Sequence, residues 1–273
     1  MVEESRGVLH AMKKILITGD SWGVGEWDWA NPDQYTISHN GLAQYFVENG
    51  VDVVNLSEGG VSNRMICQRL KHFMEANQHL TPSAIIVFQT EWTRDGSIEN
   101  AEWISEEFTS LPHNTPVYDQ FMDIDDSDRF IAAQNINMSR YYSRLSEISQ
   151  KYQVPVCVIG GVSDTMWMSK FSEEYPGVSI LCQSVTNLII NNTHQTDTPV
   201  HSCFDSTNKT DIALIKKQAS VQEMNSVLDD VANGIARRDV WQNNPEYFYP
   251  DGKHPNREGH KILYDFVANN LEL

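Results

Sequence analysis

Short β-rich runs alternate with helix-like stretches through the first half of the chain. The runs are KILIT at 14–18, VDVVNL at 51–56 and AIIVFQT at 84–90. Helix-like stretches at 40–49 and 63–77 separate them, and the second repeats apolar residues at the spacing of one helix face. Strands that alternate with helices of this length predict parallel βαβ units, because a parallel connection needs a crossover segment that a helix supplies.

The second half of the chain adds one clear strand and two long helices. A helix expected at about 131–152 leads into the apolar run VPVCVIG at 154–160, and a last helix expected at 257–270 has one apolar face. The chain has 273 residues, of which 40% are hydrophobic, which is enough for one large domain with a buried core. We therefore predict an α/β fold, with an open parallel sheet and helices on both of its faces.

Two stretches do not follow this alternation and are interpreted as insertions. The first, at about 93–130, is acidic, and the second, at about 163–249, contains a polar tract and a helix expected at 211–236. We expect both to project from the carboxyl edge of the sheet, because open α/β folds bind their ligands at that edge.

Charge and hydropathy argue against several classes of function. The net charge of −17 and a pI near 4.8 disfavour nucleic acid and anionic membrane surfaces as partners, because both attract basic proteins. No apolar run approaches the length of a transmembrane helix, and the first residues lack the apolar core of a signal peptide, so a soluble, cytoplasmic protein is expected. Met12 is a candidate start, which would make residues 1–11 a tail before a single domain at 12–273.

The four cysteines do not have the spacing of a metal site. Cys157 lies in the apolar run before 160 and is predicted to be a buried small hydrophobe, whereas a disulfide among the other three is left open. We predict no metal and no cofactor, because no cluster of zinc ligands is evident.

The turn GDSWG at 19–23 is the first candidate for chemistry. Ser21 follows the first predicted strand, and the glycines around it permit a tight turn that projects its hydroxyl from the edge of the sheet. The same residues also fit an ordinary Gly/Asp/Ser turn or a nucleotide-binding loop. A dinucleotide loop is less favoured, because G-x-G-x-x-G is absent and no well-placed acid follows the second strand.

The segment DGKHPNREGH at 251–260 is the second candidate. Asp251 and His254 are three residues apart, and Pro255 keeps that stretch from being helical. In a loop, this spacing lets the carboxylate orient the imidazole, which would accept the proton of the serine and return it to the leaving group. The alternative is a loop histidine beside an Asx turn. His260 is interpreted as a helix-face residue.

Together, these segments resemble the first and last sequence blocks of the SGNH (GDSL-like) hydrolases. Asn55 and Gly60, in NLSEGGVSN, are similar to the second block, in which an Asn five residues before a Gly ends the second strand. The resemblance covers the sheet-forming parts, about half of the chain. It implies a three-layer α/β/α sandwich with a mostly parallel, about five-stranded sheet, and hydrolysis of esters or thioesters through an acyl-serine, with Ser21, His254 and Asp251 as the triad.

The third block of this family is where the chain departs from it. That block is usually G-x-N-D, whose Asn donates to the oxyanion, but here FQTEWTRD at 88–95 has Thr90 or Glu91 in its place. A carboxylate cannot donate and a hydroxyl donates weakly, and a lost oxyanion donor typically costs about 2.7–4 kcal/mol. The candidate oxyanion donors are therefore the backbone N–H groups of Ser21 and Gly60 and the side chains of Thr90 and Asn63. Asn63 also fits the N-terminal cap of the second helix.

Candidates for the substrate pocket surround the serine and the end of the third strand. Arg94 fits an anion-binding role or an ion pair with Glu91, and the tryptophans fit either a pocket mouth for sugar rings and acyl chains or packing of the insertions. The pocket candidates are Asp20, Trp22, Glu91, Trp92 and Arg94.

These residues predict a serine esterase that removes a short acyl group, such as acetyl, from a carbohydrate or another small molecule. The alternative is a catalytically weakened protein of the same fold that binds a glycan or another ligand, because the third block is broken. An acyl transferase is less favoured, because such enzymes usually have membrane segments. The expected partner is a small-molecule or glycan ester, and the sequence does not indicate an oligomeric state.

Overall fold

A five-stranded sheet, in which all four strand pairings are parallel, forms the centre of the protein. The computed structural model describes residues 13–28, 36–90, 127–160, 175–192, 244–249 and 254–271, with side chains from residue 138 onward in the third of these ranges. The strands are β1 (Lys14–Thr18), β4 (Asp52–Asn55), β5 (Ala84–Gln89), β6 (Val156–Gly160) and β7 (Val178–Cys182). Their order across the sheet is β4-β1-β5-β6-β7.

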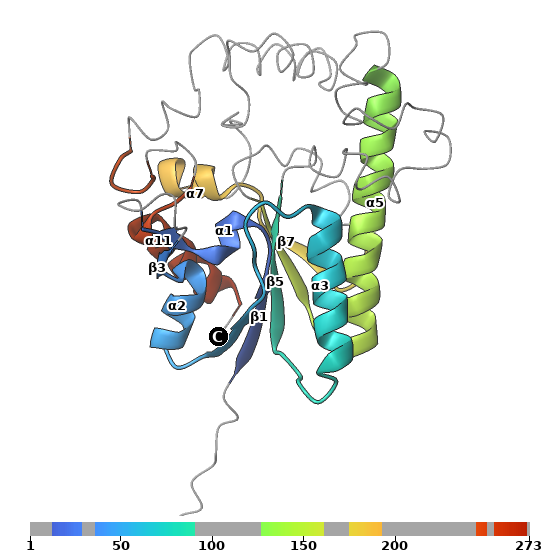
Figure 1. Cartoon of the computed structure of the whole chain (residues 1–273), viewed down its shortest axis with the longest axis horizontal. Coiled ribbons are helices and arrows are strands. Elements are labelled where there is room, and N and C mark those ends of the chain that lie inside the picture. The colour runs from blue at the N-terminus through green and yellow to red at the C-terminus, as the bar shows by residue number, and fades with distance from the viewer. Residues whose placement is uncertain are drawn as a thin grey trace, which may run out of the picture.

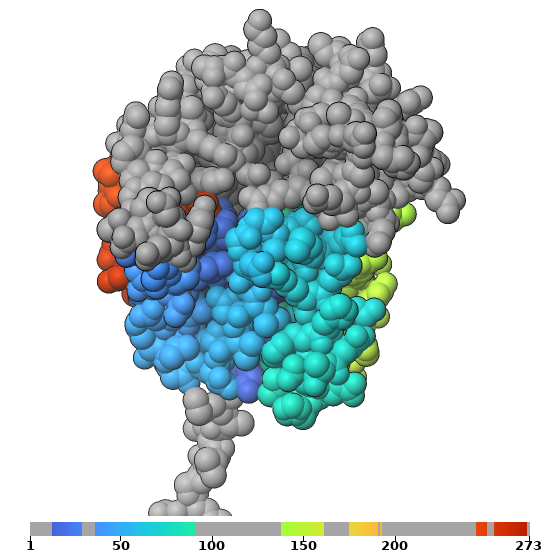
Figure 2. Space-filling model, in the orientation of Figure 1, coloured from blue at the N-terminus to red at the C-terminus, as the bar shows by residue number. Residues whose placement is uncertain are grey.

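Helices cover both faces of this sheet, as Figure 1 shows. One side has α2 (Gly41–Glu48), α7 (Val185–Asn191) and α11 (Arg257–Asn270), and the other has α3 (Asn63–Ala76) and α5 (Ser127–Tyr152). Helices α2 and α7 both pack against α11, and α3 packs against α5. In the same orientation, α2 and α3 form a continuous surface toward the viewer (Figure 2). The fold is therefore the three-layer α/β/α sandwich that the sequence predicted.

Each helical layer encloses its own hydrophobic core. In β1, Ile15 and Ile17 face the core under α2 and α11, whereas Leu16 faces the core under α3 and α5. Successive side chains of a strand point to opposite faces, so a sheet covered on both sides needs apolar residues at every position. This explains why the predicted strands read as continuous apolar runs.

The expected helices and strands of the first half agree with the structure to within a few residues. The second half requires a correction, because β7 and α7 lie inside the stretch at 163–249 that was interpreted as an insertion. Strand β7 is the edge of the sheet and is only partly buried, so VSILC lacks the clear apolar run of a central strand. The helix expected at 211–236, residues 93–126 and the tail at 1–11 lie outside the described residues.

A second, two-stranded sheet follows the first turn of the chain and was not predicted. It pairs β2 (Glu26–Trp27) with β3 (Ile37–His39) in antiparallel orientation, directly after the four-residue helix α1 (Ser21–Val24). The dipeptide Asn-Pro at 31–32, a turn signal between two short aromatic and β-branched runs, is the sequence feature that indicates it.

Three of the cysteines have a described environment. Cys157 is buried, as predicted, and Cys67 and Cys182 are buried free thiols as well. Cys203 lies outside the described residues. Among the helices that the structure describes, none is both long and apolar enough to cross a membrane.

Candidate active site

Ser21 lies where the chain leaves the carboxyl end of β1 and begins α1. The chain passes from β1 to β4 on one side and then to β5 on the other, so β1 and β5 form the switch point of the sheet. Open α/β sheets bind ligands outside the carboxyl ends of the strands at such a point. The serine therefore stands at the position where this topology leaves room for a ligand.

The two glycines that flank the turn are required by close packing. A Cβ on Gly19 would lie 2.5 Å from Cβ of Phe88 on the neighbouring strand, and a Cβ on Gly23 would lie 2.3 Å from Oγ of Ser57. Both distances are shorter than van der Waals contact allows. Glycine at these positions lets the serine turn pack directly on β5 and on the loop after β4.

Asp20 holds the serine turn, and its predicted contact with the substrate stays a prediction. Its side chain is buried and caps α1, with Oδ1 accepting from the backbone N–H of Trp22 at 3.1 Å. Its Oδ2 accepts from the hydroxyl of Thr90 at 2.8 Å. Both carboxylate oxygens therefore have protein donors and fix the backbone on either side of Ser21.

His254 reaches the site from the far end of the chain. The backbone N–H of Tyr249 donates to the carbonyl of His254 at 2.9 Å, and the N–H of Asn256 donates to the carbonyl of Tyr247 at 2.8 Å. The side chain of Asn256 caps α11 by accepting from the N–H of Gly259 at 3.2 Å. His254 is thus held between a short backbone ladder and a capped helix.

The structure brings Ser21 and His254 together across 233 residues of sequence. Oγ of the serine lies 2.7 Å from Nε2 of the histidine, and the two residues are only 5% and 7% exposed. When Nε2 accepts this hydrogen bond, the neutral imidazole carries its proton on Nδ1. Asp251, the expected partner of Nδ1, lies outside the described residues.

Two tryptophans contact the histidine ring. The centroid of Trp27 lies 5.0 Å from that of His254, and the centroid of Trp22 lies 5.8 Å from it. Trp22 is buried in the core under α2 and α11, and its role as a pocket residue stays a prediction. Trp27 is half-buried, and it is one of the tryptophans that the sequence left open between a pocket mouth and packing.

The two side chains predicted as oxyanion donors are both engaged elsewhere. Oδ1 of Asn63 accepts from the backbone N–H of Thr90 at 3.0 Å, and its Nδ2 donates to the carbonyl of the same residue at 3.2 Å. The single hydroxyl proton of Thr90 is donated to Asp20. The cap of α3 is Ser62, and Asn63 is the first residue of the helix. Thr90 and Asn63 therefore support the serine turn, and their role at the oxyanion stays a prediction, since Nδ2 of Asn63 has a second N–H.

We expect Thr90→Val to weaken this support. The substitution keeps the shape of the side chain but removes the donor to the buried carboxylate of Asp20, so the free energy of unfolding should fall by about 1–3 kcal/mol. The serine turn should be held less firmly, so kcat should fall about tenfold. Thermal unfolding and initial rates on p-nitrophenyl acetate measure the two effects.

Thr186→Val is the matched control for this substitution. Thr186 is equally buried, but its hydroxyl has no hydrogen-bond partner among the described residues. Its removal should change stability and kcat little, because no hydrogen bond is lost. Equal effects of the two valine substitutions would contradict a specific role for the hydroxyl of Thr90.

The two backbone N–H groups that were predicted to bind the oxyanion remain available. Within the described part of the chain, neither the N–H of Ser21 nor that of Gly60 donates a hydrogen bond to another residue. Asn55 fixes the loop of Gly60 against the serine turn, because its Nδ2 donates to the carbonyl of Gly23 at 2.8 Å and its Oδ1 accepts from the N–H of Ser57 at 3.0 Å. The other pocket candidates, Glu91, Trp92 and Arg94, lie outside the described residues.

Two further histidines lie behind His254. His260 is 1% exposed, and neither of its ring nitrogens has a hydrogen-bond partner among the described residues. Burial, with smaller contributions from the neighbouring His39 and His254, lowers the pKa of His260 to about 3. Burial also lowers the pKa of His39, whose Nδ1 accepts from the N–H of Gly41 at 3.0 Å. Both rings are therefore neutral at physiological pH and belong to the packing of α11.

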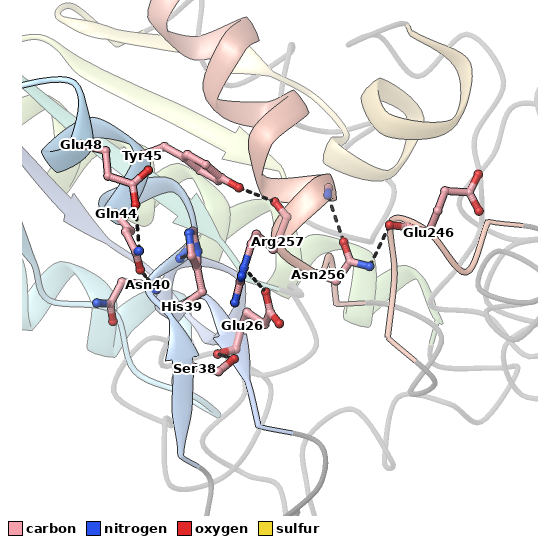
Figure 3. A network of polar contacts seen from close by, with 12 residues as sticks. Glu26, Ser38, His39, Asn40, Gln44, Tyr45, Glu48, Glu246, Asn256 and Arg257 are labelled. Atoms are coloured by element: carbon pink, nitrogen blue, oxygen red, sulfur yellow. Dashed lines mark hydrogen bonds and ion pairs between the residues drawn. The ribbon is translucent and has the colours of Figure 1, made fainter.

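Figure 3 shows how the start of α11 is joined to the β2–β3 sheet and to α2 near His39. Oε2 of Glu26 lies 3.4 Å from Nε of Arg257, and the hydroxyl of Tyr45 donates to the carbonyl of Arg257 at 3.1 Å.

Across the part of the chain that the structure describes, no group of three or more His, Cys, Asp or Glu side chains is placed to hold a metal ion.

Comparisons with known proteins find similarity only among solved structures. No protein-family model matches the sequence, and no curated protein matches it. A lipase from a goat rumen metagenome is 12% identical, with a TM-score of 0.46 and coverage of 94% of this chain and 97% of the other. The lipase/acylhydrolase from Enterococcus faecalis is 14% identical, with a TM-score of 0.39 and 96% coverage of both chains. The esterase EstA from Pseudoalteromonas sp. is 11% identical, with a TM-score of 0.38 and coverage of 95% and 97%.

Proposed function

We propose that the protein is a serine esterase that removes a short acyl group from a carbohydrate or another small molecule through an acyl-serine intermediate. The observation that carries this proposal is the 2.7 Å contact between Oγ of Ser21 and Nε2 of His254 at the carboxyl edge of the sheet. A serine and a histidine within hydrogen-bond reach form the minimal nucleophile and base of covalent hydrolysis.

The first half of the reaction forms the acyl-enzyme. Oγ of Ser21 attacks the ester carbon while its proton passes to Nε2 of His254, and the carbonyl oxygen becomes an oxyanion. The backbone N–H groups of Ser21 and Gly60 are the proposed donors to that oxyanion. The intermediate then collapses, the bond to the alcohol breaks, and the histidine gives the proton to the departing oxygen.

The second half of the reaction restores the enzyme. His254 accepts a proton from water, the resulting nucleophile attacks the acyl carbon, and the carboxylic acid leaves as Oγ of Ser21 regains its proton. Asp251 is proposed to orient the imidazole through Nδ1, as its spacing from His254 predicts. No side-chain amide is assigned to the oxyanion here, so the reaction is proposed to use two backbone donors.

The second candidate is a binding protein with weak or no hydrolytic activity. The engagement of the Thr90 hydroxyl by Asp20 favours it, because that hydroxyl is then not donated to the oxyanion, and one of the two N–H donors of Asn63 is already used by the carbonyl of Thr90. Loss of one donor typically costs about 2.7–4 kcal/mol of transition-state stabilisation, which slows an esterase without abolishing it.

Labelling with a fluorophosphonate probe distinguishes the two candidates. The probe forms a covalent bond only with a serine whose hydroxyl is activated by a base, so the esterase should be labelled at Ser21 and peptide mapping should locate the adduct there. Ser21→Ala should not be labelled. A folded wild-type protein that resists the probe and hydrolyses no p-nitrophenyl ester would support the binding protein.

A further inference from the structure

The backbone of Gly59 passes beside Ser21 and leaves a position that no side chain of the described residues fills. A Cβ on Gly59 would lie 4.0 Å from Cβ of Ser21 and 3.9 Å from Cζ2 of Trp27. These are ordinary van der Waals distances, and no nearer neighbour is found among the described residues. The position therefore has room for one carbon atom, with the nucleophile on one side and the tryptophan edge on the other.

The tryptophan side of this position is held in place. Glu26, the preceding residue, is paired with Arg257 at the start of α11, and its carbonyl accepts from the hydroxyl of Ser38 at 3.3 Å (Figure 3). The ring of Trp27 itself lies against His254. Strand β2 is thus fixed to β3 and to α11, so Trp27 bounds the position as a fixed wall.

We propose that Gly59 and Trp27 limit the acyl group to formyl or acetyl, with the methyl group of acetyl in the position above Gly59. The inference rests on the proposed function, because it assumes that Ser21 becomes acylated. Once Oγ bonds to the acyl carbon, the next atom of the acyl group lies within van der Waals reach of Cβ of Ser21. The hydrogen of a formyl group leaves the position above Gly59 empty, and the methyl group of an acetyl group fills it. A longer acyl chain meets the ring edge of Trp27.

Gly59→Ala tests this assignment directly. The glycine does not have a positive φ, and the added Cβ makes no short contact in the described structure, so the variant should fold. Its methyl group would occupy the proposed acyl position. We expect kcat/KM for p-nitrophenyl acetate to fall at least about tenfold relative to that for p-nitrophenyl formate, because only acetate brings a second carbon to the same place.

The ratio of acetate to formate turnover is the readout, and formate serves as the control within the same protein. An unchanged ratio in a variant that still hydrolyses both esters through Ser21 would overturn the acyl assignment and leave the proposed esterase intact. A loss that follows the size of the alcohol, measured with methyl acetate against p-nitrophenyl acetate, would also overturn it. A wild-type protein that hydrolyses none of these esters would contradict the proposed function itself.

Trp27→Leu tests the other wall. Removing the ring edge should raise kcat/KM for p-nitrophenyl butyrate relative to acetate by about tenfold, because the longer chain then has room. Absolute rates should fall for all substrates, since the ring also contacts His254. Phe73→Leu is the matched control, because Phe73 is a partly buried aromatic on the opposite face of the sheet. An unchanged butyrate-to-acetate ratio in Trp27→Leu would overturn the role of the tryptophan.

Discussion

Ser21→Ala is expected to lower kcat for p-nitrophenyl acetate by roughly 10⁴-fold or more while the protein remains folded. The alanine removes the only atom that can form the acyl-enzyme and fits in the same buried turn. His254→Ala should cause a loss of similar size, because a serine hydroxyl without its base is a weak nucleophile. Steady-state rates and thermal unfolding of both variants measure these effects.

The double variant Ser21→Ala/His254→Ala tests the shared mechanism more sharply than either single variant. Nucleophile and base act as one unit, so Ser21→Ala combined with His254→Ala should be little worse than either change alone. Losses that multiply would contradict a shared mechanism. Ser179→Ala and His79→Ala are matched controls outside the site and should leave kcat unchanged.

Asp251→Asn should reduce kcat less than either catalytic change, because the carboxylate orients the imidazole and transfers no proton itself.

The stability of the protein is expected to fall steeply in acid because of His260. The unfolded histidine takes up a proton below pH 6.5, whereas the folded side chain stays neutral down to about pH 3. The unfolded state therefore binds more protons between these values, and the free energy of unfolding falls as the pH drops through that window. At about 1.36 kcal/mol per pKa unit, the loss attributable to this one residue is on the order of 5 kcal/mol.

His260→Leu isolates this contribution. The variant has no titrating group at that position, so its free energy of unfolding in urea should vary less between pH 6.5 and pH 4 than that of the wild type. His79→Leu, at an exposed position, should keep the wild-type slope. If the leucine variant does not fold, the NMR titration of the His260 ring provides the same test, and protonation near pH 6 in the folded protein would contradict the prediction.

The parts of the structure that follow from local patterns were predictable from the sequence. Apolar runs located four strands of the sheet, because a strand covered on both faces needs an apolar residue at every position. The glycines around Ser21 and the proline after His254 marked two turns, and the resemblance of the two segments to the SGNH blocks predicted that they meet. The 2.7 Å contact between the two side chains is the geometry that this reasoning anticipated, while their catalytic role remains a prediction.

The parts that depend on tertiary partners were not predictable in this way. A hydroxyl such as that of Thr90 can donate to an oxyanion or to a carboxylate, and only packing brings Asp20 within 2.8 Å of it. The same holds for Asn63, whose amide turns to the backbone of Thr90, directly after β5. Strand β7 was missed because a partly exposed edge strand has a weak apolar pattern.

The distance in sequence between Ser21 and His254 determines the order in which function can appear during folding. The described support of the serine turn comes from β1, β4, β5 and α3 and from Asp20 and Thr90, which follow two of these strands. His254, by contrast, directly precedes α11 in the chain. A chain without this last segment therefore lacks both the histidine and the part of the core that α11 supplies. The proposed chemistry depends on a contact across 233 residues of sequence, which carries a large loop-closure entropy. Labelling of Ser21 should accordingly report the docking of the last helix, and it should disappear on partial unfolding before the sheet itself is lost.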